Sequence, residues 1–278
     1  MSELESVSVS RITLYPVKSL PGVEVDQATV LPSGALAGDR RWAMIDRHGK
    51  VVNAKRTPRI HELVATFQLA TDEIQMGERS QEARETFSWT NDLTSLSRWL
   101  SDFFRYDITL VEDRETGFPD DTQAPGPTVI SAETFAELTN WFEGLSIDQV
   151  RRRFRANIEL SSAIPFWEDR LIGAAEVITQ FQIGGVAFEG TNPCARCVVP
   201  TRDPDNGVVW PRFATEFATR RQDTLPVWEV SSRFDHFYRL AINTRLASDC
   251  TGGVLHVGDQ VALVERVSRP VRSANGGV

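Results

Sequence analysis

Residues 177–207 read VITQFQIGGVAFEGTNPCARCVVPTRDPDNG. Residues 177–183 alternate apolar and polar side chains and turn at Gly184-Gly185 into residues 186–188, which predicts a β-hairpin. The second half of the stretch is rich in Pro, Asn and Asp, which is typical of a loop. Two cysteines three residues apart, Cys194 and Cys197, lie in that loop. The stretch therefore predicts a strand-rich fold in which a thiol-bearing loop follows a hairpin.

The rest of the chain repeats this pattern of short strands with few helices. Helical spacing of apolar residues occurs from Leu93 to Phe103 and again after Ser131, a candidate N-cap, from Phe135 to Leu145. The expected strands are residues 7–17, a hairpin over 41–53, 63–69, 106–111, and a hairpin of 254–257 with 261–264. This composition of elements predicts a mostly β (α+β) fold of barrel or sandwich type, with a few helices, rather than a doubly wound sheet.

A polar segment over residues 112–127, rich in Gly, Pro and Asp, marks a candidate boundary. We therefore expect an N-terminal β-barrel-like domain over 8–115 and a second β-barrel domain over 116–267. Residues 268–278 are expected to form a flexible tail.

Composition excludes several classes of protein. The chain has 278 residues, 41% hydrophobic and 24% charged, and a net charge of −8, which argues against a general nucleic-acid binder. No apolar run reaches the roughly 18 residues of a spanning helix, so no membrane association is expected. Without a signal-peptide pattern at the start, we expect a cytoplasmic protein. Three cysteines are too few for a disulfide scaffold or an ordinary four-thiolate cluster.

The cysteine loop is open to several interpretations. Arg196 next to a thiolate would favour its charged form, which suits a nucleophile or a metal ligand. A structural zinc site would need Cys250 and His256 to join Cys194 and Cys197. A thioredoxin-like dithiol is disfavoured because turn residues follow the motif. A thiolate that holds a metal within a larger cofactor would need anion-binding residues elsewhere, and buried cysteines can also simply be small hydrophobic residues.

Three basic clusters far from the loop could bind anions. Lys18 and Ser19 end the first strand, and Arg40 opens the strand that follows. In the third cluster, 151–157, alternation along a strand would place Arg153, Arg155 and Asn157 on one face. Arg151 and Arg152 are interpreted as solvated surface charges.

The chain resembles the MOSC-domain family, in the branch with an N-terminal MOSC β-barrel domain that includes the mitochondrial amidoxime reducing component and its bacterial relatives. The ordered set of short motifs, rather than any single one, carries this resemblance. The motifs are YPVKS (15–19), GDRRW (38–42), FRANI (154–158), NPCARC with PTRDPDNG (192–207) and VGDQV (257–261).

The resemblance implies a molybdenum cofactor, Mo-molybdopterin, held through its pterin dithiolene and one protein thiolate. That metal ligand, and the catalytic residue, corresponds to Cys197. The expected cofactor contacts are Lys18, Ser19, Arg40, Arg155 and Asn157, with Ser131 as a further candidate and Arg196 added from its place between the cysteines.

The resemblance further implies an oxidoreductase that reduces N-hydroxylated compounds such as amidoximes, hydroxylamines and N-hydroxylated bases. The alternative is a sulfur or molybdenum-cofactor carrier that uses Cys197 as a persulfide or metal thiolate without turnover. No G-x-G-x-x-G motif indicates a nucleotide site for a reductant. We therefore expect a separate electron donor, a flavoprotein, ferredoxin or b-type cytochrome, which would dock at Arg151 and Arg152.

Overall fold

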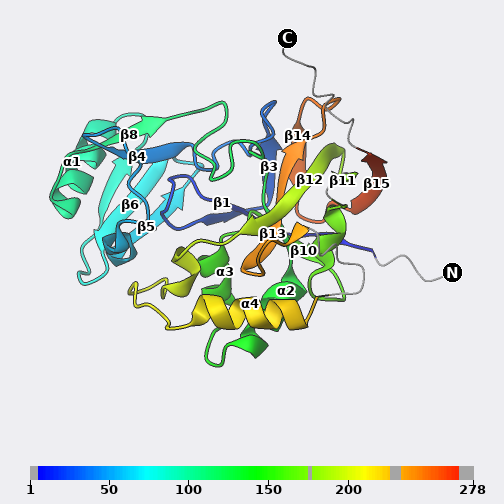
Figure 1. The fold of residues 1–278 in the computed structure, drawn as a ribbon. Helices are drawn as coiled ribbons and strands as arrows, with labels where there is room; N and C mark the ends of the chain where they lie inside the picture. The colour runs from blue at the N-terminus through cyan, green and yellow to red at the C-terminus, as the bar shows by residue number, and fades with distance from the viewer. Residues whose placement is uncertain (1–5, 175–176, 226–232, 269–278) are drawn as a thin grey trace, which may run out of the picture.

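The computed structural model describes residues 6–174, 177–225 and 233–268, and these form two lobes side by side (Figure 1). An eight-stranded sheet organises the larger lobe, and all its neighbouring strands run antiparallel except the parallel pair β9–β10. Its strands in spatial order are β15 (Val261–Ser268), β11 (Val177–Ile183), β12 (Val186–Ala195), β13 (Arg239–Leu246), β9 (Val129–Ser131), β10 (Ile158–Ser161), β1 (Ser8–Leu14) and β2 (Val23–Val25).

The smaller lobe is built from the elements β4 to β8. Its core is aromatic: the ring of Trp89 stacks on Phe67 at 5.3 Å and on Trp42 at 6.4 Å between centroids. Its elements are β4 (Trp42–Asp46) paired with β8 (Ile108–Glu112), the three-stranded sheet of β5 (Leu63–Gln68), β6 (Glu73–Glu78) and β7 (Glu85–Ser88), the 3-10 helix η1 (Pro58–Glu62) and the helix α1 (Leu93–Phe104). A separate pair, β3 (Gln27–Val30) with β14 (Gly253–His256), lies beside the large sheet.

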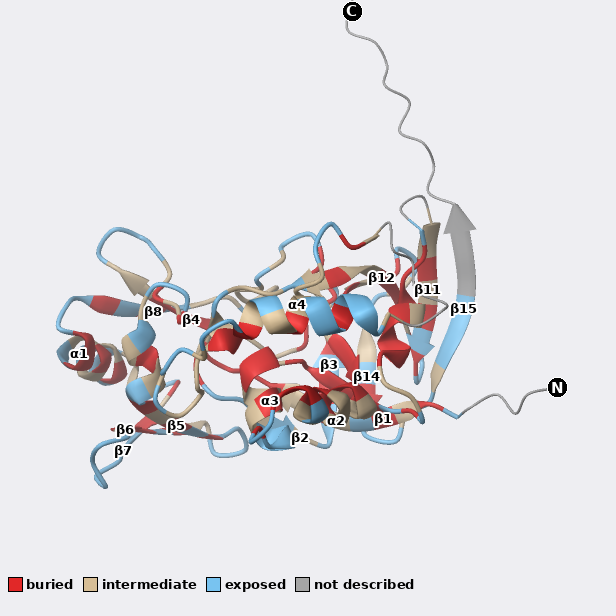
Figure 2. Ribbon diagram, turned by 60° about the horizontal axis from the view of Figure 1, so that its bottom comes forward, coloured by how far each residue is buried: buried red, intermediate tan, exposed pale blue. Residues whose placement is uncertain are grey.

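Three helices pack on the large lobe: α2 (Ala132–Trp141), α3 (Ile147–Phe154) and α4 (Phe213–Asp223). Phe142 and Phe213 stack at 4.3 Å between these helices. Helix α4 carries both buried and exposed residues, as expected of a helix packed on one side (Figure 2). The short 3-10 helices η2 (Trp167–Leu171) and η3 (Val199–Thr201) complete the elements.

Two carboxylates and one arginine are buried together beneath α4. Asp169 and Arg221 form an ion pair, and both side chains are almost fully buried. Glu168, only 1% exposed, accepts hydrogen bonds from the Ser131 amide and the Thr134 hydroxyl at the start of α2. Burial, and then the neighbouring Asp169 carboxylate, raises the pKa of Glu168 to about 7. The cluster thus holds one cation against two acidic groups.

The mostly β (α+β) architecture with few helices is confirmed. The hairpin of residues 177–188 is present as β11 and β12, joined through Ile183 and Val186. The helix from Leu93 is α1, and Ser131 caps α2 by accepting a hydrogen bond from the Thr134 amide. The strand expected at 63–69 is β5.

Of two further predicted hairpins, the short one over 41–53 is present, and the one of 254–257 with 261–264 is wrong in its pairing. In the first, the chain turns after Asp46, and the Val52 amide donates to the Met44 carbonyl at 2.8 Å beside a bridge of Ile45 to Val51. The longer partner of β4 is β8, which lies more than sixty residues further along the chain. β14 and β15 follow one another but pair with β3 and β11 respectively. Local alternation identifies a strand but says nothing about which distant strand satisfies its hydrogen bonds.

The boundary between 8–115 and 116–267 stays a prediction. β1 and β2 belong to the same sheet as strands from beyond residue 128, with Val9 opposite Leu160, so the large sheet draws on both segments. The tail predicted over 268–278 lies outside the described residues after Ser268. Within the described ranges, every helix is too short or too polar to cross a bilayer.

Candidate functional site: a basic cavity with a thiol loop

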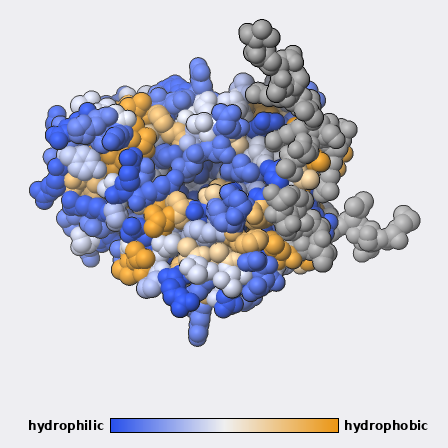
Figure 3. Space-filling model, in the orientation of Figure 1, coloured by the Kyte–Doolittle hydropathy of each residue, from blue (hydrophilic) through white to orange (hydrophobic). Residues whose placement is uncertain are grey.

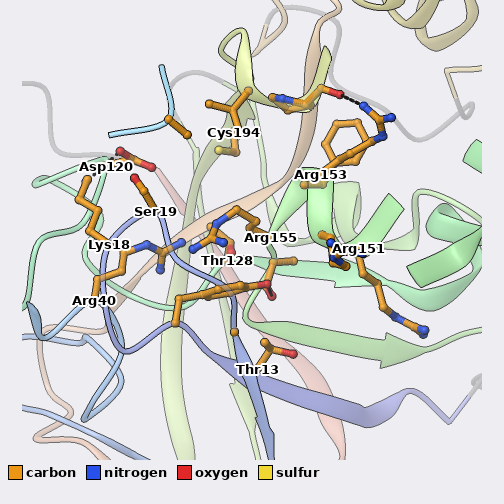
Figure 4. Close-up of a pocket in the computed structure, with 18 of the residues that line it drawn as sticks. Thr13, Lys18, Ser19, Arg40, Asp120, Thr128, Arg151, Arg153, Arg155 and Cys194 are labelled. Carbon is orange, nitrogen blue, oxygen red and sulfur yellow. Dashed lines mark hydrogen bonds and ion pairs between the residues drawn. The ribbon is translucent and has the colours of Figure 1, made fainter. Parts of the chain in front are cut away.

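A cavity of about 440 Å³ is lined by residues of both lobes. Lys18 and Ser19 reach it from the segment after β1, Arg40 from the segment before β4, and Arg155 from the end of α3. Cys194 and Cys197 reach it from the end of β12 and the turn beyond. Figure 4 shows Arg40 and Arg155 converging in this space, with Cys194 across from them. The structure therefore brings together most of the expected site residues from four separate stretches of sequence.

The cavity is basic although the chain is acidic. Its lining contains about twice as many arginines and lysines as aspartates and glutamates, whereas the whole chain carries a net charge of −8. Hydrophilic residues also cover most of the face seen in Figure 3, with apolar residues in separate patches. A concentration of cations within low-dielectric walls attracts anionic ligands.

Three cavity residues have left-handed backbone conformations. φ is +74° at Ser19, +47° at Arg40 and +54° at Arg155. Non-glycine residues rarely adopt this region because Cβ crowds the backbone. Such conformations persist where the surroundings fix them, and they often occur at ligand sites.

Arg155 and Arg40 lie against the ring of Tyr15. The guanidinium carbon of Arg155 is 4.1 Å from the ring centroid and that of Arg40 is 5.4 Å from it. Arg155 Nη1 donates to the carbonyl of Leu20 at 2.7 Å, whereas its buried Nη2 has no hydrogen-bond partner among the described residues. An unpaired buried donor is costly, and a bound acceptor would remove that cost.

The ammonium group of Lys18 is held by the loop that joins β8 to β9. Its Nζ donates to the carbonyls of Phe118 and Pro119 at 2.8 and 3.2 Å, and to Asp120 at 2.9 Å. Burial lowers the pKa of Lys18, although Asp120 opposes the shift. Burial would raise the pKa of Asp120, but the charge and hydrogen bond of Lys18, together with the charges of Arg40 and Lys55, outweigh it and hold that pKa at about 2. Lys18 therefore faces the cavity as half of an ion pair.

Asn157 and Ser131 do not line the cavity. Asn157 is 2% exposed, and its Nδ2 donates to the Thr13 carbonyl and to Asp39, each at 3.0 Å. Since Asp39 pairs with Arg40, Asn157 supports the cavity wall from behind. Ser131 is fully buried as the N-cap of α2.

Two arginines brace the thiol loop. Arg196 donates to the carbonyls of Phe154 and Leu240 at 3.0 and 2.7 Å. Arg153, with its side chain 2% exposed, donates to the carbonyls of Pro200 and Arg202 downstream of Cys197. The Cys197 sulfur accepts a hydrogen bond from the Val199 amide at 3.4 Å. Arg196 lines the cavity as expected, but its terminal nitrogens bind the protein backbone.

The expected strand over 153–157 is wrong. Helix α3 continues to Phe154, and the left-handed Arg155 ends it before β10 begins at Ile158. Arg153, Arg155 and Asn157 therefore point in different directions instead of sharing one face. A capping box of Ser146 with Gln149 starts this helix. That pair of residues is a sequence signal for a helix start, and the search for periodic apolar residues did not include it.

Arg151 and Arg152 both form ion pairs within the chain. Arg151 makes a bidentate ion pair with Glu159, with its Nε 2.8 Å from Oε1 and its Nη2 2.8 Å from Oε2. Arg152 forms an ion pair with Asp205. Both side chains already have carboxylate partners, and the docking of an electron donor at them stays a prediction.

The zinc alternative finds no support in the described residues, where no three His, Cys, Asp or Glu side chains come together in a way that could hold a metal ion. Cys250 packs instead against the core of the large sheet. All three cysteines are free thiols.

Sequence reasoning missed four residues that shape the cavity. Tyr15 and Asp39 stood inside quoted motifs without a role, while Asp120 lay in the polar segment interpreted as a boundary. His61 of η1 lines the cavity with a buried Nε2 that has no partner within the described chain, and burial lowers its pKa. No local pattern marks these residues, because each acquires its role from a contact distant in sequence.

The fold and the cavity define a two-lobed, mostly β protein in which a free thiol and a cluster of cations line one cavity. Family models agree with this class. The MOSC N-terminal beta barrel domain matches residues 6–107 and the MOSC domain matches residues 128–262, so the chain belongs to the MOSC family.

Curated relatives cover most of the chain at low identity. The mitochondrial amidoxime-reducing component 1 of Danio rerio is 24% identical over an alignment of 288 positions, which covers 91% of this chain and 83% of the relative. The mitochondrial amidoxime reducing component 2 of Homo sapiens is 24% identical over an alignment of 240 positions, which covers 73% of this chain and 68% of the relative. A molybdenum cofactor sulfurase of Drosophila mojavensis is 24% identical over an alignment of 218 positions, which covers 67% of this chain but 27% of the relative.

Proposed function

We propose that this chain is a molybdenum-cofactor-dependent oxidoreductase that reduces N-hydroxylated compounds. One observation carries the proposal: the thiol of Cys197 shares a cavity with Lys18, Ser19, Arg40 and Arg155. A metal-binding thiolate and a phosphate site are the two features that a pterin cofactor with a terminal phosphate needs. The names of the relatives support the same activity class.

The residues present fit such a cofactor. Cys197 supplies a soft ligand of the kind that suits a transition metal. The unpaired Nη2 of Arg155 is a donor that a phosphate oxygen could engage, and Arg40 is adjacent to it. Ser19 adds a hydroxyl on the same wall. When bound, the cofactor would supply two-electron chemistry at the metal.

The protein's own contribution would be binding, orientation and proton supply. Reduction of a hydroxylamine balances as R–NHOH + 2 e⁻ + 2 H⁺ → R–NH₂ + H₂O, so two protons must reach the substrate nitrogen and its departing oxygen. Arg196 and Arg153 would hold the thiol loop in one conformation, which lowers the cost of reorganisation. The electrons would come from a separate flavoprotein, ferredoxin or b-type cytochrome.

Metal and pterin analysis tests the proposal. Protein expressed in a host that makes the cofactor should contain molybdenum and pterin, and reduced viologen should drive reduction of an aromatic amidoxime. Cys197→Ala should lose molybdenum and activity. Cys250→Ala, which changes a cysteine packed on the sheet core, is the matched control and should keep both. Molybdenum-free wild-type protein, or full occupancy in Cys197→Ala, would refute the assignment.

A carrier of sulfur or cofactor is the second candidate, favoured by the similarity to a molybdenum cofactor sulfurase and by the partly exposed thiol of Cys197. It predicts a persulfide on Cys197 in freshly purified protein without bound pterin. Mass spectrometry of the intact chain separates the two, because the oxidoreductase should carry pterin and an unmodified thiol.

A further inference from the structure

The ring of Tyr15 is a buried surface that carries two guanidinium groups. The residue is 5% exposed and lies at the end of β1, and Arg155 and Arg40 approach its ring at 4.1 and 5.4 Å. Attraction between a cation and the negative face of an aromatic ring strengthens when both are shielded from water. The ring can therefore hold two like charges closer together than they would otherwise lie.

Three contacts fix the ring itself. The Tyr15 hydroxyl donates to the carbonyl of Ala156 at 3.1 Å, next to Arg155. Its backbone amide donates to Asp39 at 2.8 Å, next to Arg40. A Cβ at Gly22 would lie 2.7 Å from the ring, so the glycine backbone closes off one side of it. Tyr15 is thus tied to both arginines through the residue adjacent to each.

The charges around the ring do not balance. Asp39 pairs with Arg40, but the hydrogen bond of Arg155 goes to the uncharged Leu20 carbonyl. Burial raises the pKa of Tyr15 to about 12, so its hydroxyl stays neutral and supplies no counter-charge. Burial, and to a smaller extent the neighbouring Arg40, disfavours the charge of Arg155, whose pKa is lowered. Buried charge without a partner is expensive, so the arrangement favours a bound anion.

We propose that Tyr15 is a positioning residue whose ring holds Arg155 and Arg40 side by side so that together they bind one phosphate group. Guanidinium groups are planar forks that match phosphate oxygens, and two of them can offset a doubly charged group. The proposal deepens the proposed function and rests on it only in assigning that phosphate to the cofactor. This clamp, formed by Arg155 and Arg40 against the ring of Tyr15, is a property of the chain's own residues.

Titration of cofactor-free protein with inorganic phosphate tests the clamp. The full chain is expressed in a host that cannot make the pterin, and phosphate binding is measured by calorimetry at low salt. Tyr15→Leu should weaken phosphate binding about five- to tenfold, because the ring face is lost. Tyr15→Phe should restore binding to within about twofold, since it keeps the ring and loses only the hydroxyl. Tyr106→Leu, at an exposed tyrosine of the smaller lobe, is the matched control and should bind as wild type does.

A second variant keeps the test decisive if Tyr15→Leu does not fold. Pentafluorophenylalanine at position 15 preserves the shape of the ring but reverses the polarity of its face, so it should weaken phosphate binding to a similar extent. Unchanged affinity in this variant, or no phosphate binding by wild-type protein at millimolar concentration, would overturn the proposal.

The cofactor supplies an independent readout. In a cofactor-competent host, the pterin content of Tyr15→Leu should fall while that of Tyr15→Phe stays near wild type. If phosphate binding depends on the ring but the wild-type protein takes up no molybdenum in the cofactor-competent host, the role of Tyr15 stands and the proposed function is refuted. Molybdenum loading with no effect of the ring on phosphate binding would do the reverse.

Discussion

Replacing Glu168 by glutamine is expected to remove a pH-dependent loss of stability. Glu168, Asp169 and Arg221 are buried together, so one of the two carboxyl groups has no cation of its own. Glutamine has the same shape and keeps an oxygen to accept from the Ser131 amide and the Thr134 hydroxyl. It cannot acquire a charge as pH rises.

The expected magnitude follows from the pKa of Glu168, which burial raises from 4.5 to about 7. A raised pKa means that the folded state binds this proton more tightly than the unfolded chain does. The resulting stability is fully present below about pH 4.5 and is lost as pH rises through about 7. At about 1.4 kcal/mol for each pKa unit, the loss is on the order of 3 kcal/mol.

Urea unfolding at pH 5, 6, 7 and 8 measures this effect. Wild type and Glu168→Gln should have similar free energies of unfolding at pH 5, and the variant should be more stable at pH 8 by roughly the amount above. Glu143→Gln, at an exposed glutamate, is the control and should follow the wild-type dependence on pH. Parallel curves for wild type and Glu168→Gln across this range would refute the reasoning.

Three further changes test other parts of the structure. Asp120→Asn releases Lys18 from its ion pair, so phosphate binding to cofactor-free protein should tighten about three- to tenfold at low salt and much less at 0.5 M salt. Calorimetry measures both affinities, and equal affinities of wild type and variant at low salt would contradict this. Arg153→Leu leaves the carbonyls of Pro200 and Arg202 without their donor, so the free energy of unfolding in urea should fall by about 2–4 kcal/mol. The control Arg245→Leu, at a half-exposed arginine, should lower it by under about 1 kcal/mol. Gly190→Ala would place a Cβ 1.7 Å from the Leu171 carbonyl oxygen, so we expect a loss of more than about 3 kcal/mol or failure to fold, whereas Gly185→Ala, with open space around it, should be nearly neutral in thermal unfolding.

Sequence patterns predicted the elements better than their partners. The hairpin at Gly184-Gly185 and the helix from Leu93 are both set by local alternation or spacing, and both are present. The pairing of β4 with β8 and of β14 with β3 depends on contacts far apart in sequence, which no local pattern encodes. Helix α3 was not predicted because it has only a few apolar residues among its arginines, too few to give a recognisable helical spacing.

The residues of the cavity were predictable only where a local sequence motif marked them. Lys18, Ser19, Arg40, Arg155 and Cys197 were identified through motifs, and all of them line one cavity. Asn157 shares a motif with Arg155, yet it supports the wall from behind. The carboxylates of Asp39 and Asp120 came to light only through their partners Arg40 and Lys18, which lie in the cavity wall.

The membership of β1 in the large sheet has a consequence for biosynthesis. Its first residue, Ser8, pairs with Ser161, so about 150 residues must be made before the strand finds this neighbour. At about 5–20 residues per second, β1 waits roughly 8–30 s on the ribosome with its apolar face uncovered. Lys18 and Arg40 emerge during that delay, but the thiol of Cys197 comes later still. Any group that binds this thiol within the cavity must therefore be inserted after Cys197 has been made, when β1 can already pair with β10.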